Sequence, residues 1–160
     1  MIPTTPEPQR RRDAFLRYAL LVVWIVVIFF LSGYEGSMSQ TSRFIRPILE
    51  FLFPAADEPT LHFIHGLVRK FAHFAEYAVL AFFGVRAFRT LAVFQSKNLA
   101  YAVAFLLVLS VAAVDETNQS FTTTRTGSIL DVLLDVCGGT AMLAAVFLFE
   151  KRSFKLAHTP

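Results

Sequence analysis

The chain has 160 residues, about the size of one domain. Hydrophobic residues make up 55% and charged residues only 17%, with a mean hydropathy of +0.54, which excludes an ordinary soluble domain. The net charge is +3 and the pI is near 9.3, but the basic residues gather at the ends of apolar runs and form no basic stripe, which argues against a nucleic-acid partner.

The first predicted membrane helix runs from Phe15 to Gly33 and contains YALLVVWIVVIFFL after the basic segment RRRDAFLR. A membrane-spanning helix needs about 20 mostly apolar residues. A cleaved signal peptide is the alternative, because a basic region precedes the apolar run. The run is long and bulky and no A-x-A site follows it, which favours a membrane anchor.

The connection 34–66 begins with small and polar residues and then contains the segment FIRPILEFLF. The apolar residues of this segment recur at helical spacing and share one face: Phe44, Ile45, Ile48, Phe51 and Leu52. This pattern predicts a short helix that lies in the membrane interface. A lid over a substrate is the alternative interpretation.

Three further spanning helices are predicted, from Leu67 to Phe88, from Leu99 to Val114 and from Ile129 to Phe149. The first and last of these three reach spanning length only if their charged residues lie inside the helix. The predicted fold is therefore all-α, an integral membrane bundle of four transmembrane helices with one short interfacial helix in the first extracytoplasmic connection.

Basic residues on one side of this topology predict its orientation. They are Arg10, Arg11, Arg12, Arg17, Arg86, Arg89, Lys97, Lys151, Arg152 and Lys155. Because cytoplasmic segments carry the excess of Lys and Arg, we expect a multi-pass protein of the cell membrane with both termini cytoplasmic. The predicted parts are a cytoplasmic basic tail (1–14), a transmembrane domain (15–149) and a cytoplasmic tail (150–160).

Three separate segments carry polar residues to the opposite, extracytoplasmic face. The candidate ligand-binding residues are Lys70, His73, Glu76, Tyr77, Asp115, Glu116, Gln119, Arg125, Asp131 and Asp135. At about 100° per residue, those of the second helix share one face, as do the two aspartates of the fourth. Ionisable groups at this depth cost roughly 3 kcal/mol or more unless they face the bundle interior or water. The coincidence indicates a composite polar site.

Several of these residues also have structural explanations. Lys70 could extend to the membrane surface from a helix end, Asp131 could cap its helix together with Ser128, and His73 could be a hydrogen-bonded interior histidine. Glu76 and Asp135 are the hardest to explain structurally.

The charges of the candidate site do not balance. Lys70 and Arg125 face five carboxylates, those of Glu76, Asp115, Glu116, Asp131 and Asp135. Either some carboxylates are protonated, or a cation completes the site. A divalent metal with oxygen ligands is one option, although neither a D-x-D nor an H-E-x-x-H spacing is present, so no cofactor is assigned.

Two blocks of these residues resemble the VanZ-like family, small bacterial membrane proteins named after a protein associated with low-level resistance to the glycopeptide antibiotic teicoplanin. The first block is Lys70, His73, Phe74, Glu76, Tyr77 and Leu80. The second is Asp115, Glu116, Gln119, Phe121, Arg125, Thr126, Gly127, Ser128, Asp131, Val132 and Asp135. The resemblance, which covers about residues 20–148, implies a four-helix membrane domain with an outward polar site. It departs at Asn118, where the family commonly has His.

Three functions remain open from the sequence. The favoured hypothesis is binding or modulation of an anionic envelope component such as a lipid-linked cell-wall precursor, with Lys70 and Arg125 on its phosphate. An enzyme acting on an envelope substrate is the second, with Glu76, His73 or Asp131 as acid or base. The third is a buried ion-pair network in an interaction protein. Proton-coupled transport is disfavoured, because the first and third helices carry no ionisable residue at mid-membrane depth.

Overall fold

The fold was determined from a computed structural model that describes residues 7–33, 38–91, 96–120 and 128–157. This part of the chain contains five helices and no strand: α1 (Glu7–Ser32), α2 (Met38–Leu52), α3 (Glu58–Phe88), α4 (Lys97–Ser120) and α5 (Ile129–Ala157). Four of them, α1, α3, α4 and α5, are long and apolar enough to cross a membrane. The predicted all-α architecture is confirmed, including the short helix between the first two spans.

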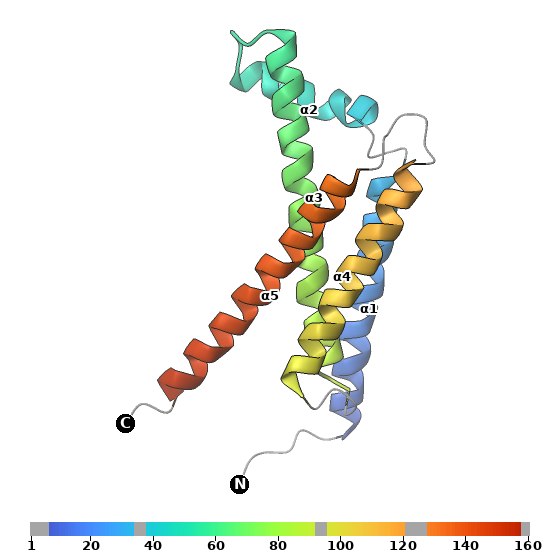
Figure 1. The fold of residues 1–160 in the computed structure, drawn as a ribbon, viewed down its shortest axis with the longest axis vertical. Coiled ribbons are helices and arrows are strands. Elements are labelled where there is room, and N and C mark those ends of the chain that lie inside the picture. The colour runs from blue at the N-terminus through green and yellow to red at the C-terminus, as the bar shows by residue number, and fades with distance from the viewer. Residues whose placement is uncertain (1–6, 34–37, 92–95, 121–127, 158–160) are drawn as a thin grey trace.

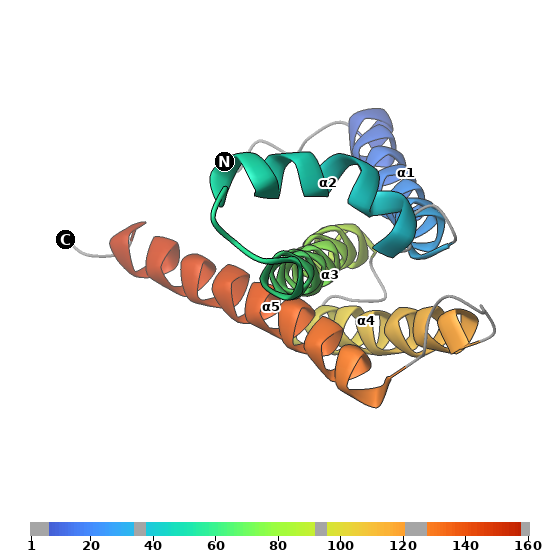
Figure 2. The ribbon, with the colours of Figure 1, turned by 90° about the horizontal axis from the view of Figure 1, so that it is seen from above.

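Helix α3 lies at the centre of the bundle and packs against each of the other four helices. The four long helices run along the long axis, whereas α2 lies across one end (Figure 1). Seen from above, α3 lies between α2 on one side and α5 on the other (Figure 2). The far half of α5 diverges from α4 and α1, so that α5 is held mainly by α3 (Figure 1).

The long helices extend beyond their predicted apolar segments. Helix α3 begins at Glu58, earlier than the predicted Leu67, because Asp57 caps it and Pro59 lies in its first turn. The Asp57 Oδ1 atom accepts a hydrogen bond from the backbone N–H of Thr60 at 3.1 Å, and hydrogen bonding with the Thr60 side chain and backbone lowers the pKa of Asp57. The apolar pattern located the part of each helix that is apolar enough to cross a membrane, while polar capping residues decided where α3 begins.

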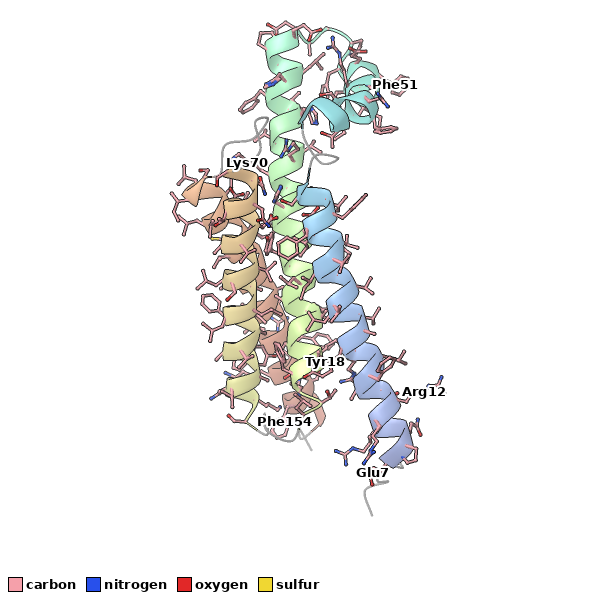
Figure 3. The ribbon with its side chains drawn as sticks, turned by 90° about the vertical axis from the view of Figure 1, so that its right-hand side faces the viewer. Glu7, Arg12, Tyr18, Phe51, Lys70 and Phe154 are labelled. Carbon is pink, nitrogen blue, oxygen red and sulfur yellow. The ribbon has the colours of Figure 1, made fainter. Side chains whose placement is uncertain are left out.

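Helix α2 is attached to the first turns of α3 by polar contacts. The His65 ring lies 3.1 Å (Nε2) from Thr41 Oγ1 and 3.3 Å (Nδ1) from Ser42 Oγ, and Arg46 forms an ion pair with Glu58. Leu49 of α2 is also buried. The face that carries Phe44, Ile48 and Phe51 is exposed, and Figure 3 shows Phe51 on the outer side of α2. This arrangement is typical of an interfacial helix.

Two adjacent glycines bring α5 into close contact with its neighbours. A Cβ atom on Gly138 would overlap the backbone carbonyl of Phe74 on α3. A Cβ atom on Gly139 would lie 2.6 Å from Cγ1 of Val108 on α4. The close packing expected of small residues in membrane helices is therefore present at these two positions.

The predicted basic segments meet at the end of the bundle that lies opposite α2. Arg17 donates to the backbone carbonyl of Arg86 at 3.4 Å, and Glu150 forms ion pairs with Arg89 and with Lys97, the latter at 4.0 Å. The N-terminal end of α1 and the C-terminal end of α5 lie at this same end (Figure 1).

Candidate functional site

The candidate residues that the structure describes lie on α3, α4 and α5, where α4 ends and α5 begins. Figure 3 labels Lys70 at this level, toward the α2 end of the bundle. Arg125 lies outside the described residues. The structure brings the remaining candidates into two layers and a surrounding shell.

The outer layer contains an ion pair and a small cavity. Lys70 Nζ lies 3.0 Å from Asp131 Oδ1, and both side chains are partly exposed. The cavity has a volume of about 190 Å³. Its lining residues are Gly66, Arg69, Lys70, His73, Glu116, Gln119, Asp131 and Leu134. Two cationic side chains of α3 therefore share one cavity with carboxylates of α4 and α5.

The inner layer, which we call the inner cluster, consists of His73, Asp115 and Asp135, one residue from each of three helices. His73 Nδ1 lies 3.6 Å from Asp135 Oδ1. One potential ligand atom from each residue lies within 4.8 Å of the other two. Asp115 and Asp135 are both 0% exposed. The three residues are positioned by helix packing, because Gly138 holds α5 against α3 one turn after Asp135.

Gln119 connects the inner cluster to α1. Its Nε2 atom donates to Asp115 Oδ2 at 3.0 Å and to Ser32 Oγ at 2.9 Å. Ser32 is buried and was not among the residues expected from the sequence. The sequence did contain a signal for Ser32. It is a small polar residue at the end of the first predicted helix, on the same side of the topology as Gln119.

Glu116 and Ser128 determine how α5 begins. The Glu116 carboxylate accepts a hydrogen bond from the backbone N–H of Ser128 at 2.8 Å, and Ser128 Oγ accepts one from Leu130 N at 3.2 Å. Ser128 thus caps α5, whereas Asp131 bonds across to Lys70. The sequence suggested that Asp131 could cap the helix together with Ser128. In the structure Ser128 is the residue that caps α5.

Glu76 and Tyr77 lie one turn deeper on α3. Tyr77 is completely buried, and its hydroxyl has no hydrogen-bond partner among the described residues. Glu76 is half-buried, and its backbone carbonyl accepts a hydrogen bond from Trp24 Nε1 of α1 at 2.9 Å. Together with Ser32, Trp24 makes α1 part of the shell around the site.

Asn118, the position at which the sequence departs from the resemblance described above, is exposed on α4. It lies outside the buried face formed by Asp115, Glu116 and Gln119. The side chain at this position is therefore not part of the inner cluster.

A larger cavity lies elsewhere among the described residues, between α3 and α5 near the basic end of the bundle. It has a volume of about 860 Å³, and its lining is mainly apolar, with the charged residues Arg17, Arg86, Arg89 and Glu150 among the lining residues. The smaller cavity is the better candidate site despite its size, because His73 of the inner cluster and the buried Glu116 line it.

Four spanning helices with a polar cluster between three of them define a multi-pass integral membrane protein. The chain belongs to the VanZ/LLP1 family, whose family model matches residues 15–150. Comparisons with curated proteins and with solved structures gave no match.

Proposed function

We propose that this VanZ/LLP1-family protein binds an anionic, phosphate-bearing lipid of the bacterial cell envelope. The observation that supports this function is the cavity of about 190 Å³ to which Arg69, Lys70 and His73 contribute. A phosphate group would receive charge-assisted hydrogen bonds from Lys70 and, as the sequence predicts, from Arg125. The carboxylates of Glu116 and Asp131 would orient the cations and bind sugar or peptide hydroxyl and amide groups.

The position of the cavity favours a lipid-borne ligand over a freely soluble one. It lies at the ends of spanning helices, where a head group can remain at the boundary with water while its hydrocarbon chain stays in the bilayer. With the basic end cytoplasmic, the cavity faces the extracytoplasmic leaflet. The ligand class that we favour is a lipid-linked cell-wall precursor, which would connect the protein to tolerance of teicoplanin.

The test uses the full chain purified in detergent and farnesyl diphosphate as the probe, with binding measured by titration. We expect Lys70→Ala and Arg125→Ala to weaken binding by roughly 10- to 100-fold, as expected for loss of a hydrogen bond to a charged group. Lys97→Ala is the matched control, because Lys97 is exposed at the other end of the bundle. Farnesol, which lacks phosphate, should not bind. Equal affinity of the Lys70→Ala and Lys97→Ala variants would contradict the proposal.

A second candidate function is an enzyme of the cell envelope, favoured by the contact between His73 Nδ1 and Asp135 Oδ1. A carboxylate beside an imidazole orients the ring for proton transfer. In this function His73 would act as the general acid or base and Asp135 would orient it. Release of inorganic phosphate from the diphosphate probe, lost in Asp135→Asn, would support this function. If Lys70→Ala and Asp135→Asn lower only thermal stability, the polar residues form a structural network.

A further inference from the structure

We propose that His73, Asp115 and Asp135 form a binding site for one divalent transition-metal ion inside the helix bundle. The three side chains come from α3, α4 and α5, and their potential ligand atoms lie within 4.8 Å of one another. This site is distinct from the Lys70–Asp131 ion pair, and the inference does not rest on the proposed lipid ligand.

The first argument is that buried oxygen and nitrogen atoms in the cluster lack hydrogen bonds. Within the described residues, Asp115 Oδ1, both carboxylate oxygens of Asp135 and His73 Nδ1 make no hydrogen bond. Both aspartates are 0% exposed, so water does not solvate them from the surface. Buried polar atoms without partners are costly, and carboxylates at membrane depth more so. A bound cation would supply the missing interactions.

The second argument is charge. When both are ionised, the two buried carboxylates carry two negative charges, and no lysine or arginine among the described residues forms an ion pair with Asp115 or Asp135; Lys70 is paired with Asp131. A protonated His73, which contacts Asp135 Oδ1, would supply only one positive charge for the two carboxylates. A divalent ion balances both carboxylates and also accepts the lone pair of the neutral imidazole.

The third argument concerns geometry and ion type. With metal–ligand distances of about 2.0–2.2 Å, two ligands of a tetrahedral ion lie about 3.4 Å apart. The 3.6 Å between His73 Nδ1 and Asp135 Oδ1 is close to that value, and small side-chain rotations would bring Asp115 into range. One imidazole with two carboxylates suits Zn²⁺, Fe²⁺ or Mn²⁺ and is less suited to Mg²⁺ or Ca²⁺.

The experiment measures metal binding directly. The full chain is purified in detergent, treated with a chelator and titrated with Mn²⁺, and bound metal is quantified by elemental analysis. We expect one ion per chain, with affinity reduced at least about tenfold in Asp115→Asn and Asp135→Asn. Asp131→Asn is the matched control, since it is the same substitution one turn away on α5, and it should bind Mn²⁺ as the wild type does.

A spectroscopic readout distinguishes ligation from a structural effect. Electron spin echo of bound Mn²⁺ should show coupling to an imidazole nitrogen, and His73→Gln should abolish this coupling. His73→Gln also keeps the test decisive if Asp135→Asn does not fold. Absence of a stoichiometric ion in the wild type, or equal loss of affinity in Asp131→Asn and Asp135→Asn, would overturn the proposal. Metal binding that persists in Lys70→Ala while the lipid probe is lost would separate this site from the lipid cavity.

Discussion

At the scale of single residues, the buried hydrogen bonds of Gln119 are central to the cluster. Gln119 holds Asp115 from one side and Ser32 of α1 from the other, at 3.0 and 2.9 Å. It therefore orients a buried carboxylate and also connects two spanning helices.

We predict that Gln119→Ala lowers the free energy of unfolding by about 1–3 kcal/mol, because buried partners of Gln119 lose a donor. Thermal unfolding in detergent measures the effect. Thr117→Ala is the control: Thr117 is exposed on the same helix and bonds only within its own turn, to the carbonyl of Ala113. Equal stabilities of the two variants would contradict a structural role for Gln119.

Asn118 provides a second prediction at this scale. Because its side chain is exposed and outside the buried face of α4, we expect Asn118→His to leave Mn²⁺ affinity and farnesyl diphosphate affinity within about twofold of wild type. The same titrations check this. A large gain in either affinity would show that the position takes part in binding.

At the scale of helices, close packing between α3 and α5 positions Asp135 beside His73. Gly138 lies against the backbone of Phe74, which neighbours His73 on α3. The backbone of a packed helix cannot move as a flexible side chain does, so the approach of the two helices at this level leaves room only for glycine.

We predict that Gly138→Ala destabilises the protein by about 1–3 kcal/mol, because the added methyl group forces α5 away from α3. Metal affinity should fall together with stability. Gly84→Ala is the matched control: its Cβ would lie 3.5 Å from Ala104 Cβ, an ordinary contact, and alanine is the better helix former. If both variants unfold at the same temperature, the contact with Phe74 does not restrain the two helices.

At the scale of the whole molecule, the two ends of the bundle differ in charge and in chemistry. One end gathers Arg17, Arg86, Arg89 and Lys97, while the other carries the polar cavity and α2. The exposed apolar residues of α1 and α5 between the two ends suit contact with hydrocarbon.

We predict that the basic end is cytoplasmic, following the distribution of Lys and Arg. A green fluorescent protein fused after residue 160 should fluoresce, and alkaline phosphatase fused at the same position should be inactive. Alkaline phosphatase fused after Phe53, beyond α2, should be active. The reverse pattern would place the polar cavity in the cytoplasm and remove the basis for an extracytoplasmic ligand.

The sequence alone determined the helical membrane architecture of this protein. Spanning helices must satisfy their own backbone hydrogen bonds in lipid, so long apolar runs identify them without knowledge of tertiary contacts. Asp131 and Asp135 were recognisable as candidate site residues because carboxylates are rare at that depth of a membrane. The pattern of apolar runs could not locate the start of α3, because that start depends on the local cap formed by Asp57.

Only the tertiary structure decided which polar residues meet. Lys70 pairs with Asp131 and His73 faces Asp135, although the helical spacing on α3 made other pairings equally compatible with the sequence. It also brought Ser32 into contact with Gln119 and left Asn118 exposed. Periodicity indicates which face of a helix a residue occupies. The rotation of one helix against another and the distance between them depend on packing between helices. Here they depend on glycines of α5 that contact α3 and α4, and the sequence of one helix does not reveal such contacts.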